Sequence, residues 1–185
     1  MRWSGGPAVG GSGRAARRYR LLMIATRFDT ERLALLPLHV EYAEEMAKVL
    51  ADPGLYTFTS GEPPSAEVLE GRYTRQVAGS GDPGESWLNW VISSLQDDEL
   101  VGYVQATVTA DAAEIAWVLG TAWQGRGYAK EAAIGLVAWL RAQGARRITA
   151  HVHPDHAASA SVAAAAGLSR TDQIDDGEFL WLLTT

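Results

Sequence analysis

The stretch WQGRGYAKEA, residues 123–132, constrains the fold of this chain more than any other segment. A strand-like run, AEIAWVL at 113–119, precedes it, and a helix-forming run follows to about residue 143. Two glycines in such a turn let the backbone approach a ligand closely and adopt unusual dihedral angles. Successive N–H groups and the helix dipole then favour an anion there. The segment therefore predicts a strand–turn–helix unit that binds phosphate-like anions.

The remaining pattern predicts a mixed sheet with helices on its faces. Helices are expected where apolar residues recur at helical spacing, as at Ala43, Met46 and Leu50. Strand-like runs alternate with these helices. In chain order we expect a strand at 32–38, helices at 40–50 and 65–77, a hairpin of strands at 87–95 and 100–109, a strand at 113–119, a helix to 143, a strand at 147–153, a helix at 156–166 and a strand at 177–184.

Composition fits one domain of ordinary size. The chain has 185 residues, of which 47% are hydrophobic, so it can bury a sizeable core. It has no cysteine, which excludes disulfides, thiolate metal sites and a cysteine nucleophile, and fits a reducing cytoplasm. No apolar run is long enough to span a membrane. We therefore expect a cytoplasmic protein with no bound metal and no membrane partner.

Charge divides the chain into two parts. Residues 1–22 contain five arginines and no acid, whereas 11 basic residues stand against 22 acids in residues 23–185. Residues 1–22 are rich in Gly and Arg without periodicity, so we expect a disordered leader there, with Met23 as an alternative start. Residues 23–185 are expected to form the single folded domain. Their acidity argues against nucleic acid as a partner and suits a cationic substrate such as an amine.

The glycine turn fits one phosphate-binding pattern better than others. The chain has no P-loop sequence, and a dinucleotide fingerprint fails because Lys130 stands at its last glycine. Residues 124–129, QGRGYA, do fit the pattern Q/R-x-x-G-x-G/A. Together with TERLALLPL near the start, AEIAWVL before the turn and HVHPDHAASASVAAAAGL after it, this hexapeptide resembles the GNAT superfamily of N-acetyltransferases. The likeness is to the Rim-type branch of ribosomal-protein acetyltransferases, from about Thr30 to the C-terminus.

The resemblance implies an α/β (α+β) chain with the GNAT fold, a mixed, mostly antiparallel seven-stranded sheet flanked by helices. It also implies acetyl-CoA as cosubstrate, with the pyrophosphate at the glycine turn and the pantetheine paired to the family's fourth strand. A tight turn with solvated cations is the alternative for these residues. The residues expected to bind the cofactor are Trp117, Val118, Leu119, Gln124, Gly125, Arg126, Gly127, Tyr128, Ala129, Lys130 and His156.

The implied chemistry needs a proton acceptor. A lysine-like amine is neutral, and thus able to attack a thioester, in only about one molecule in 2,500 at pH 7. By family position Glu114 is the first candidate base, with a solvated carboxylate at the sheet rim as its alternative. His151 and His153 are the rivals, because they alternate on one side of a strand and titrate near neutral pH.

Two positions depart from the family pattern. His156 replaces an asparagine, and its ring can still donate one hydrogen bond to pantetheine. Ala163 stands where many relatives have a tyrosine that protonates the leaving thiolate. Ser159 matches a serine of the Rim-type pattern and is expected to assist the thiolate, with helix capping as its alternative role. The expected catalytic residues are Glu114, Ser159 and His153.

We therefore expect an acetyl-CoA-dependent N-acetyltransferase, monomeric or homodimeric, that acetylates a primary amine by direct attack in a ternary complex. The acceptor would be a small molecule or a protein N-terminus, met by Tyr56, Phe58, Trp87, Trp90 and an acidic turn at 175–178. Because the two tryptophans lie three apart on a strand, one should be core. The two departures from the family pattern leave open a second function, a non-catalytic sensor that binds acyl-CoA. The glycine turn taken by itself leaves open a third, a nucleotide-binding protein.

Overall fold

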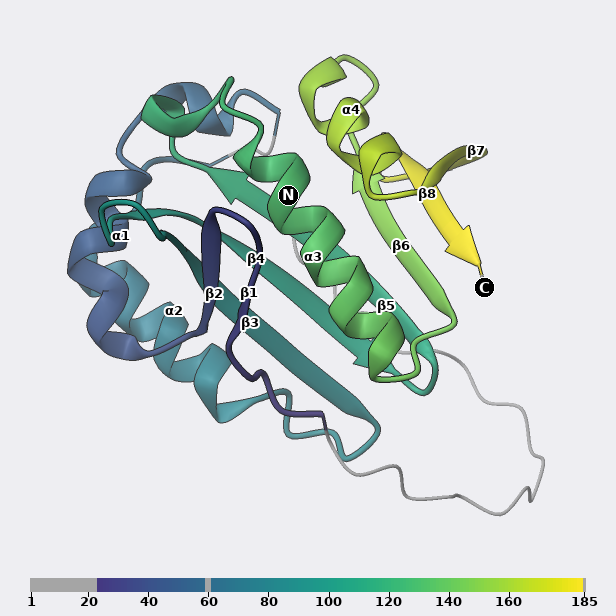
Figure 1. The fold of residues 1–185 in the computed structure, drawn as a ribbon, viewed down its shortest axis with the longest axis horizontal. Coiled ribbons are helices and arrows are strands. Elements are labelled where there is room, and N and C mark those ends of the chain that lie inside the picture. The colour runs from purple at the N-terminus through teal and green to yellow at the C-terminus, as the bar shows by residue number, and fades with distance from the viewer. Residues whose placement is uncertain (1–22, 59–60, 185) are drawn as a thin grey trace.

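The computed structural model describes residues 23–58 and 61–184, which form one sheet with helices on both faces (Figure 1). The strands lie in the order β1-β2-β3-β4-β5-β6-β8-β7. They are β1 (Phe28–Asp29), β2 (Leu33–Pro37), β3 (Glu85–Ser94), β4 (Leu100–Thr109), β5 (Ala112–Leu119), β6 (Arg147–Val152), β7 (Ser169–Asp175) and β8 (Glu178–Thr184). The predicted leader at 1–22 lies outside the described residues, and the single domain at 23–185 stays a prediction.

The sheet confirms the predicted fold class, since every described strand pair is antiparallel except β5 with β6. The described residues form eight strands in this sheet rather than the expected seven. β1 spans two residues, too few for periodicity to reveal. β7, SRTDQID, is polar and mostly exposed, so it lacks the apolar alternation that marks a strand. Backbone pairing rather than burial defines both strands.

The helices divide between the two faces of the sheet. They are α1 (Ala43–Val49), α2 (Ala66–Ala78), α3 (Tyr128–Ala142) and α4 (Ala157–Ala165). Figure 1 shows α3 crossing one face of the sheet, with α4 near its first turns and α1 and α2 on the other side. Their ends follow local chemistry: Ser65 Oγ accepts from Val68 N at 3.3 Å and caps α2. The helix predicted at 40–50 instead begins as a 3₁₀ turn, Val40–Tyr42, before α1.

The core has one part on each face. Between the sheet and α3 lie Trp90, Ile115 and Leu136, all fully buried. Between the sheet and the α1/α2 pair lie Met46, Leu69 and Val91. Neighbours on β3 thus point to opposite faces, as the pleat requires. Trp90 is core and Trp87 is half-buried, which confirms that only one of the two tryptophans fills the interior.

The strands β5 and β6 separate after a short parallel pairing. They pair only from Ala112 with Arg147 to Glu114 with Thr149. Within the described chain, β5 continues to Leu119 and β6 to its own end without further pairing between them. The edge of β5 that faces the gap therefore offers backbone N–H and C=O groups to another extended chain. This gap positions the site.

Candidate active site

A cavity of about 600 Å³ occupies the gap between β5 and β6 and extends to the first turns of α3 and α4. The volume is in the range of small-molecule and cofactor sites. Ten of the eleven residues expected to bind the cofactor line it, Arg126 being the exception. Of the expected catalytic residues, His153 and Ser159 line it and Glu114 does not. His151, the other candidate base, also faces the cavity.

The glycine turn presents a row of backbone N–H groups. Gly125 and Gly127 have φ angles of 76° and 82°, in the left-handed region that favours glycine. Within the described chain, no N–H group from Gly125 to Lys130 donates to a protein acceptor. The Lys130 side chain adds a positive charge to the same wall. Free N–H groups, a helix N-terminus and one cation fit a pyrophosphate.

An ion pair between Arg32, which directly precedes β2, and Glu131 in the first turn of α3 supports the glycine turn. Glu131 Oε1 accepts from Thr30 Oγ1 and from the Arg32 backbone N–H, and Glu131 Oε2 accepts from Arg32 Nε, each at 2.7 Å. Partial burial tends to raise the pKa of Glu131, but these hydrogen bonds outweigh it and hold the pKa below its usual value. Arg32 Nη1 also donates to Arg126 O at 3.1 Å, and the guanidinium lies over the Tyr128 ring. These contacts tie the glycine turn to the residues that precede β2.

The Glu114 and His151 side chains meet where β5 and β6 part. His151 Nδ1 lies 3.5 Å from Glu114 Oε1, at the outer limit of a hydrogen bond. This contact with Glu114 raises the pKa of His151 above its usual value, against the effect of partial burial, and Asp175 and Glu178 add attraction. Glu114 is more than half exposed, whereas the His151 side chain is 20% exposed. Glu114 is therefore the acidic neighbour of Nδ1 on His151, a residue that lines the cavity.

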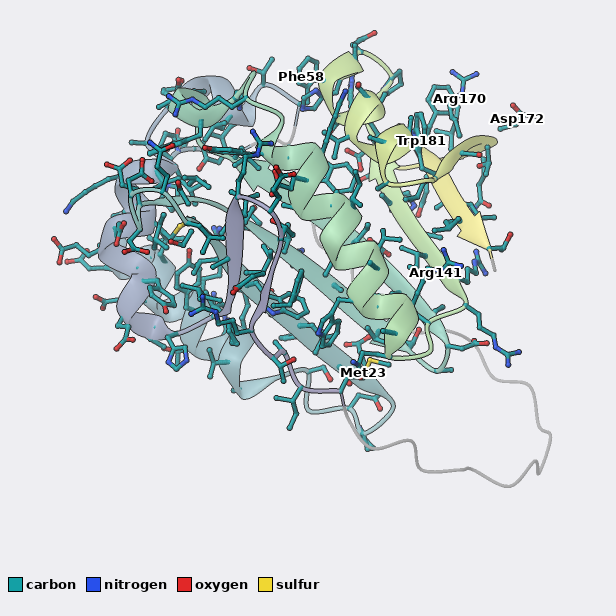
Figure 2. The ribbon with its side chains drawn as sticks, in the orientation of Figure 1. Met23, Phe58, Arg141, Arg170, Asp172 and Trp181 are labelled. Atoms are coloured by element: carbon teal, nitrogen blue, oxygen red, sulfur yellow. The ribbon has the colours of Figure 1, made fainter. Side chains whose placement is uncertain are left out.

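Two further histidines share a wall with Phe58. The Phe58 ring stacks on His156 with 4.5 Å between ring centroids and lies 5.3 Å from His153. Figure 2 shows Phe58 beside the start of α4. His156 Nδ1 accepts from Ser159 N at 3.5 Å as the cap of α4, and burial lowers its pKa. His156 is thus neutral with its one N–H at Nε2. His153 Nδ1 accepts from Asp155 N at 3.2 Å.

The indole of Trp117 crosses the gap to α4. Its Nε1 donates to Ser159 Oγ at 3.2 Å. As acceptor in this bond, the Ser159 hydroxyl keeps its own proton available for another partner. The bond also spans β5 and the first turn of α4, so it fixes the width of the cavity.

The expected acceptor residues are spread over several environments. Phe58 lines the cavity, but Trp90 is core, and Trp87 Nε1 donates to Glu85 Oε1 at 2.7 Å. Tyr56 Oη donates to Leu50 O at 3.0 Å on the α1 side. Of the acidic turn, Glu178 reaches the cavity wall.

Sequence reasoning missed the Arg32–Glu131 pair and the pairing of Glu114 with His151. The one available signal was Glu131 itself, an acid in the first turn of a helix that follows the glycine turn. Its partner Arg32 lies 99 residues away, so no local pattern connects them.

Some kinds of site are not found in the described residues. Across residues 23–58 and 61–184, no group of three or more potential metal ligands is close enough to hold an ion. In the same part of the chain, no helix combines the length and apolarity needed to cross a bilayer.

The large cavity thus joins a helix N-terminus with free N–H groups to the unpaired edge of a split sheet. A family model for the acetyltransferase (GNAT) domain matches residues 32–169, and the chain therefore belongs to the GNAT family of acetyltransferase enzymes. This confirms the family that the sequence predicted. No curated protein matches the chain in sequence.

Solved structures of the same fold include ribosomal-protein acetyltransferases. One is the ribosomal-protein-S5-alanine acetyltransferase from Vibrio fischeri, with 18% identity, a TM-score of 0.70, and 86% of this chain and 96% of that one covered. Another is RimL, a ribosomal L7/L12 alpha-N-protein acetyltransferase in complex with coenzyme A, at 15% identity, TM-score 0.71, and 86% and 98% coverage. The microcin C7 self-immunity acetyltransferase MccE, in complex with acetyl-CoA and AMP, has 16% identity, TM-score 0.70, and 84% and 93% coverage.

Proposed function

We propose that this enzyme transfers an acetyl group from acetyl-CoA to a primary amine by direct attack in a ternary complex. The observation that carries the proposal is the single cavity that joins the N–H groups of the glycine turn to His151 across the β5–β6 gap. We expect a monomer or homodimer in the cytoplasm, acting on a small molecule or a protein N-terminus, without metal.

The cavity suits acetyl-CoA at both ends. Gly125, Gly127 and Lys130 would hold the pyrophosphate, with Arg126 close enough on the same turn to add charge. The unpaired edge of β5 at Trp117 to Leu119 would pair with the pantetheine amides, and its N–H groups would polarise the thioester carbonyl. His156 would donate from Nε2 to a pantetheine amide oxygen. When bound, acetyl-CoA supplies an activated acetyl group on sulfur.

His151 is the proposed proton acceptor, with Glu114 as its positioning residue. Glu114, 3.5 Å from Nδ1, would favour the proton on that nitrogen, which would leave the Nε2 lone pair to accept a proton from a substrate in the cavity. As the amine nitrogen bonds to the carbonyl carbon and the C–S bond breaks, Nε2 takes one amine proton, directly or through water. His153 is less suited, because its Nδ1 already accepts from Asp155 N and its Nε2 then bears the proton.

Ser159 is the proposed group that meets the leaving thiolate. The Trp117 indole donates to its oxygen, which orients the hydroxyl and leaves its proton free to bond the sulfur. A thiolate is a fair leaving group near neutral pH, so the alanine at position 163 is compatible with turnover.

Thermal unfolding with and without acetyl-CoA tests the cofactor, and thiol release with a panel of amines tests the transfer. Acetyl-CoA at 100 times its Kd should stabilise the fold by about 2.7 kcal/mol, a rise in Tm of several degrees for a chain of this size. Dephospho-CoA should give a smaller rise if Lys130 or Arg126 meets the 3′-phosphate. No rise with either ligand contradicts the proposal, and binding without turnover on any amine would support a sensor instead.

A further inference from the structure

A second, smaller cavity lies on the other face of the sheet. Its volume is about 50 Å³, and its walls come from α2, β3 and β4. A water molecule needs roughly 10–15 Å³ of such space, so the cavity admits a group of a few heavy atoms. Its polar lining consists of Arg72, Gln76, Asn89, Tyr103 and Gln105, together with the Tyr73 ring.

The charge of this lining has one sign. Arg72 is the ionised residue of the wall, and no carboxylate contributes to it. Within the described chain, no acid lies within 4.0 Å of the Arg72 guanidinium, although the chain as a whole is acidic. Burial raises the pKa of Tyr103 to about 12, so its hydroxyl stays protonated. A guanidinium with no acidic partner in the described part of the chain, beside protonated hydroxyl and amide donors, is suited to an anion.

The polar lining leads from α2 to the gap beside β5. Gln76 Nε2 donates to Asn89 Oδ1 at 3.3 Å, Asn89 is paired across the sheet with Gln105, and Gln105 with Ala116. Two residues further along, on the same face of the sheet, Tyr103 is paired with Val118. Val118 lines the large cavity and Tyr103 the small one, so the two cavities adjoin across neighbouring strands.

We propose that the small cavity is the subsite for a carboxylate carried by the acceptor, so that the substrates are amines that bear a carboxylate. This assignment rests on the proposed acetyl transfer. Arg72 would bind the carboxylate, Gln76, Asn89 and Gln105 would orient it, and the amine would reach the β5 gap across Tyr103. The small volume favours a planar carboxylate over a bulkier phosphate.

The test compares straight-chain amino acids, from glycine to 6-aminohexanoate, with the carboxamide of each. Acetyl transfer is followed by thiol release, and each rate is divided by the fraction of amine that is neutral at the assay pH. The acids should exceed their amides in kcat/KM by about tenfold or more at the chain length that spans the two cavities, because a hydrogen bond to a charged partner is lost in the amide.

Substitutions on α2 supply the matched controls. Arg72→Gln should abolish the preference through a higher KM for the acids, with the amides unchanged, and Arg72→Lys should restore part of it. Arg75→Gln removes a charge from the same helix outside both cavities and should keep the preference.

The outcomes separate this inference from the proposed function. Amides acetylated as fast as acids, or a preference that survives Arg72→Gln, overturn the carboxylate subsite while the acetyl transfer stands. Failure of every amine in both series, with acetyl-CoA bound, overturns the transfer and this inference with it.

Discussion

Placing a charge at Gly125 gives the sharpest test of the pyrophosphate site. Gly125 lines the large cavity with a φ of 76°, and a Cβ built there meets no atom within 4 Å. Asn and Asp are the side chains that best tolerate left-handed backbone. Gly125→Asn and Gly125→Asp therefore have nearly the same shape and strain, and they differ by one negative charge. Gly127 is a less suitable position for this comparison. A Cβ there lies 3.5 Å from the Arg32 guanidinium, which would form an ion pair with an introduced aspartate.

The magnitude follows from Coulomb's law. Two unit charges about 4 Å apart repel by about 1 kcal/mol in water and about 4 kcal/mol near a protein surface. Gly125→Asp should therefore bind acetyl-CoA between roughly fivefold and several hundredfold more weakly than Gly125→Asn. Both variants should lose a similar amount of stability relative to the wild type, about 1 kcal/mol for the left-handed backbone.

Titration calorimetry with acetyl-CoA at low and high salt measures this difference. The ratio of the two Kd values should fall as salt rises, since the Debye length shortens from about 10 Å at 0.1 M to about 3 Å at 1 M. Equal Kd values for the Asn and Asp variants at low salt would refute the placement of an anion at this turn.

Three further changes test the residues around the cavity. Glu114→Gln removes the partner that raises the pKa of His151. The acidic limb of the pH profile of kcat/KM should therefore move to lower pH, with the Kd for acetyl-CoA unchanged. An acidic limb that does not move would show that His151 is not the base. Ser159→Ala should lower kcat roughly tenfold, which is less than a general acid commonly contributes. Single-turnover assays measure this effect, and an unchanged kcat would rule out a role for Ser159 in thiolate departure. Glu131→Gln should lower the free energy of unfolding by about 1–2 kcal/mol at pH 7 in urea titrations. Because the pKa of Glu131 is lowered in the fold, the wild type's advantage should persist above the ordinary glutamate pKa and shrink as pH falls below it; a constant difference argues against an ionised Glu131.

The sequence predicted those parts of the fold that local patterns encode. The limits of α3 and of β4 follow from apolar spacing and from the glycine turn, and the structure places them within one or two residues of the prediction. β7 escaped prediction because it is held by pairing with β8 and buries little side-chain surface. Periodicity reports burial, so a strand stabilised mainly through its backbone leaves no periodic signal.

The candidate site divides in the same way. The turn at 124–130 is contiguous, so its spacing was readable from the sequence. The base is not contiguous: Glu114 and His151 lie on different strands, and only the short β5–β6 pairing brings them together. The sequence indicated Glu114 as the proton acceptor only through its position in the family's fourth strand. The geometry instead supports a role for Glu114 as the partner of His151.

Net charge describes the surface as a whole and does not describe the two ends of this site. The acidic balance suggested a cationic acceptor, and Glu178 on the cavity wall near His151 is consistent with an ammonium group arriving there. Arg72, however, has no acidic partner within 4.0 Å among residues 23–58 and 61–184, and it lines the small cavity. An acceptor with an amine at one end and a carboxylate at the other would meet opposite charges at both ends. Charge separation across the sheet, rather than the sign of the total, is therefore the property that should select the substrate.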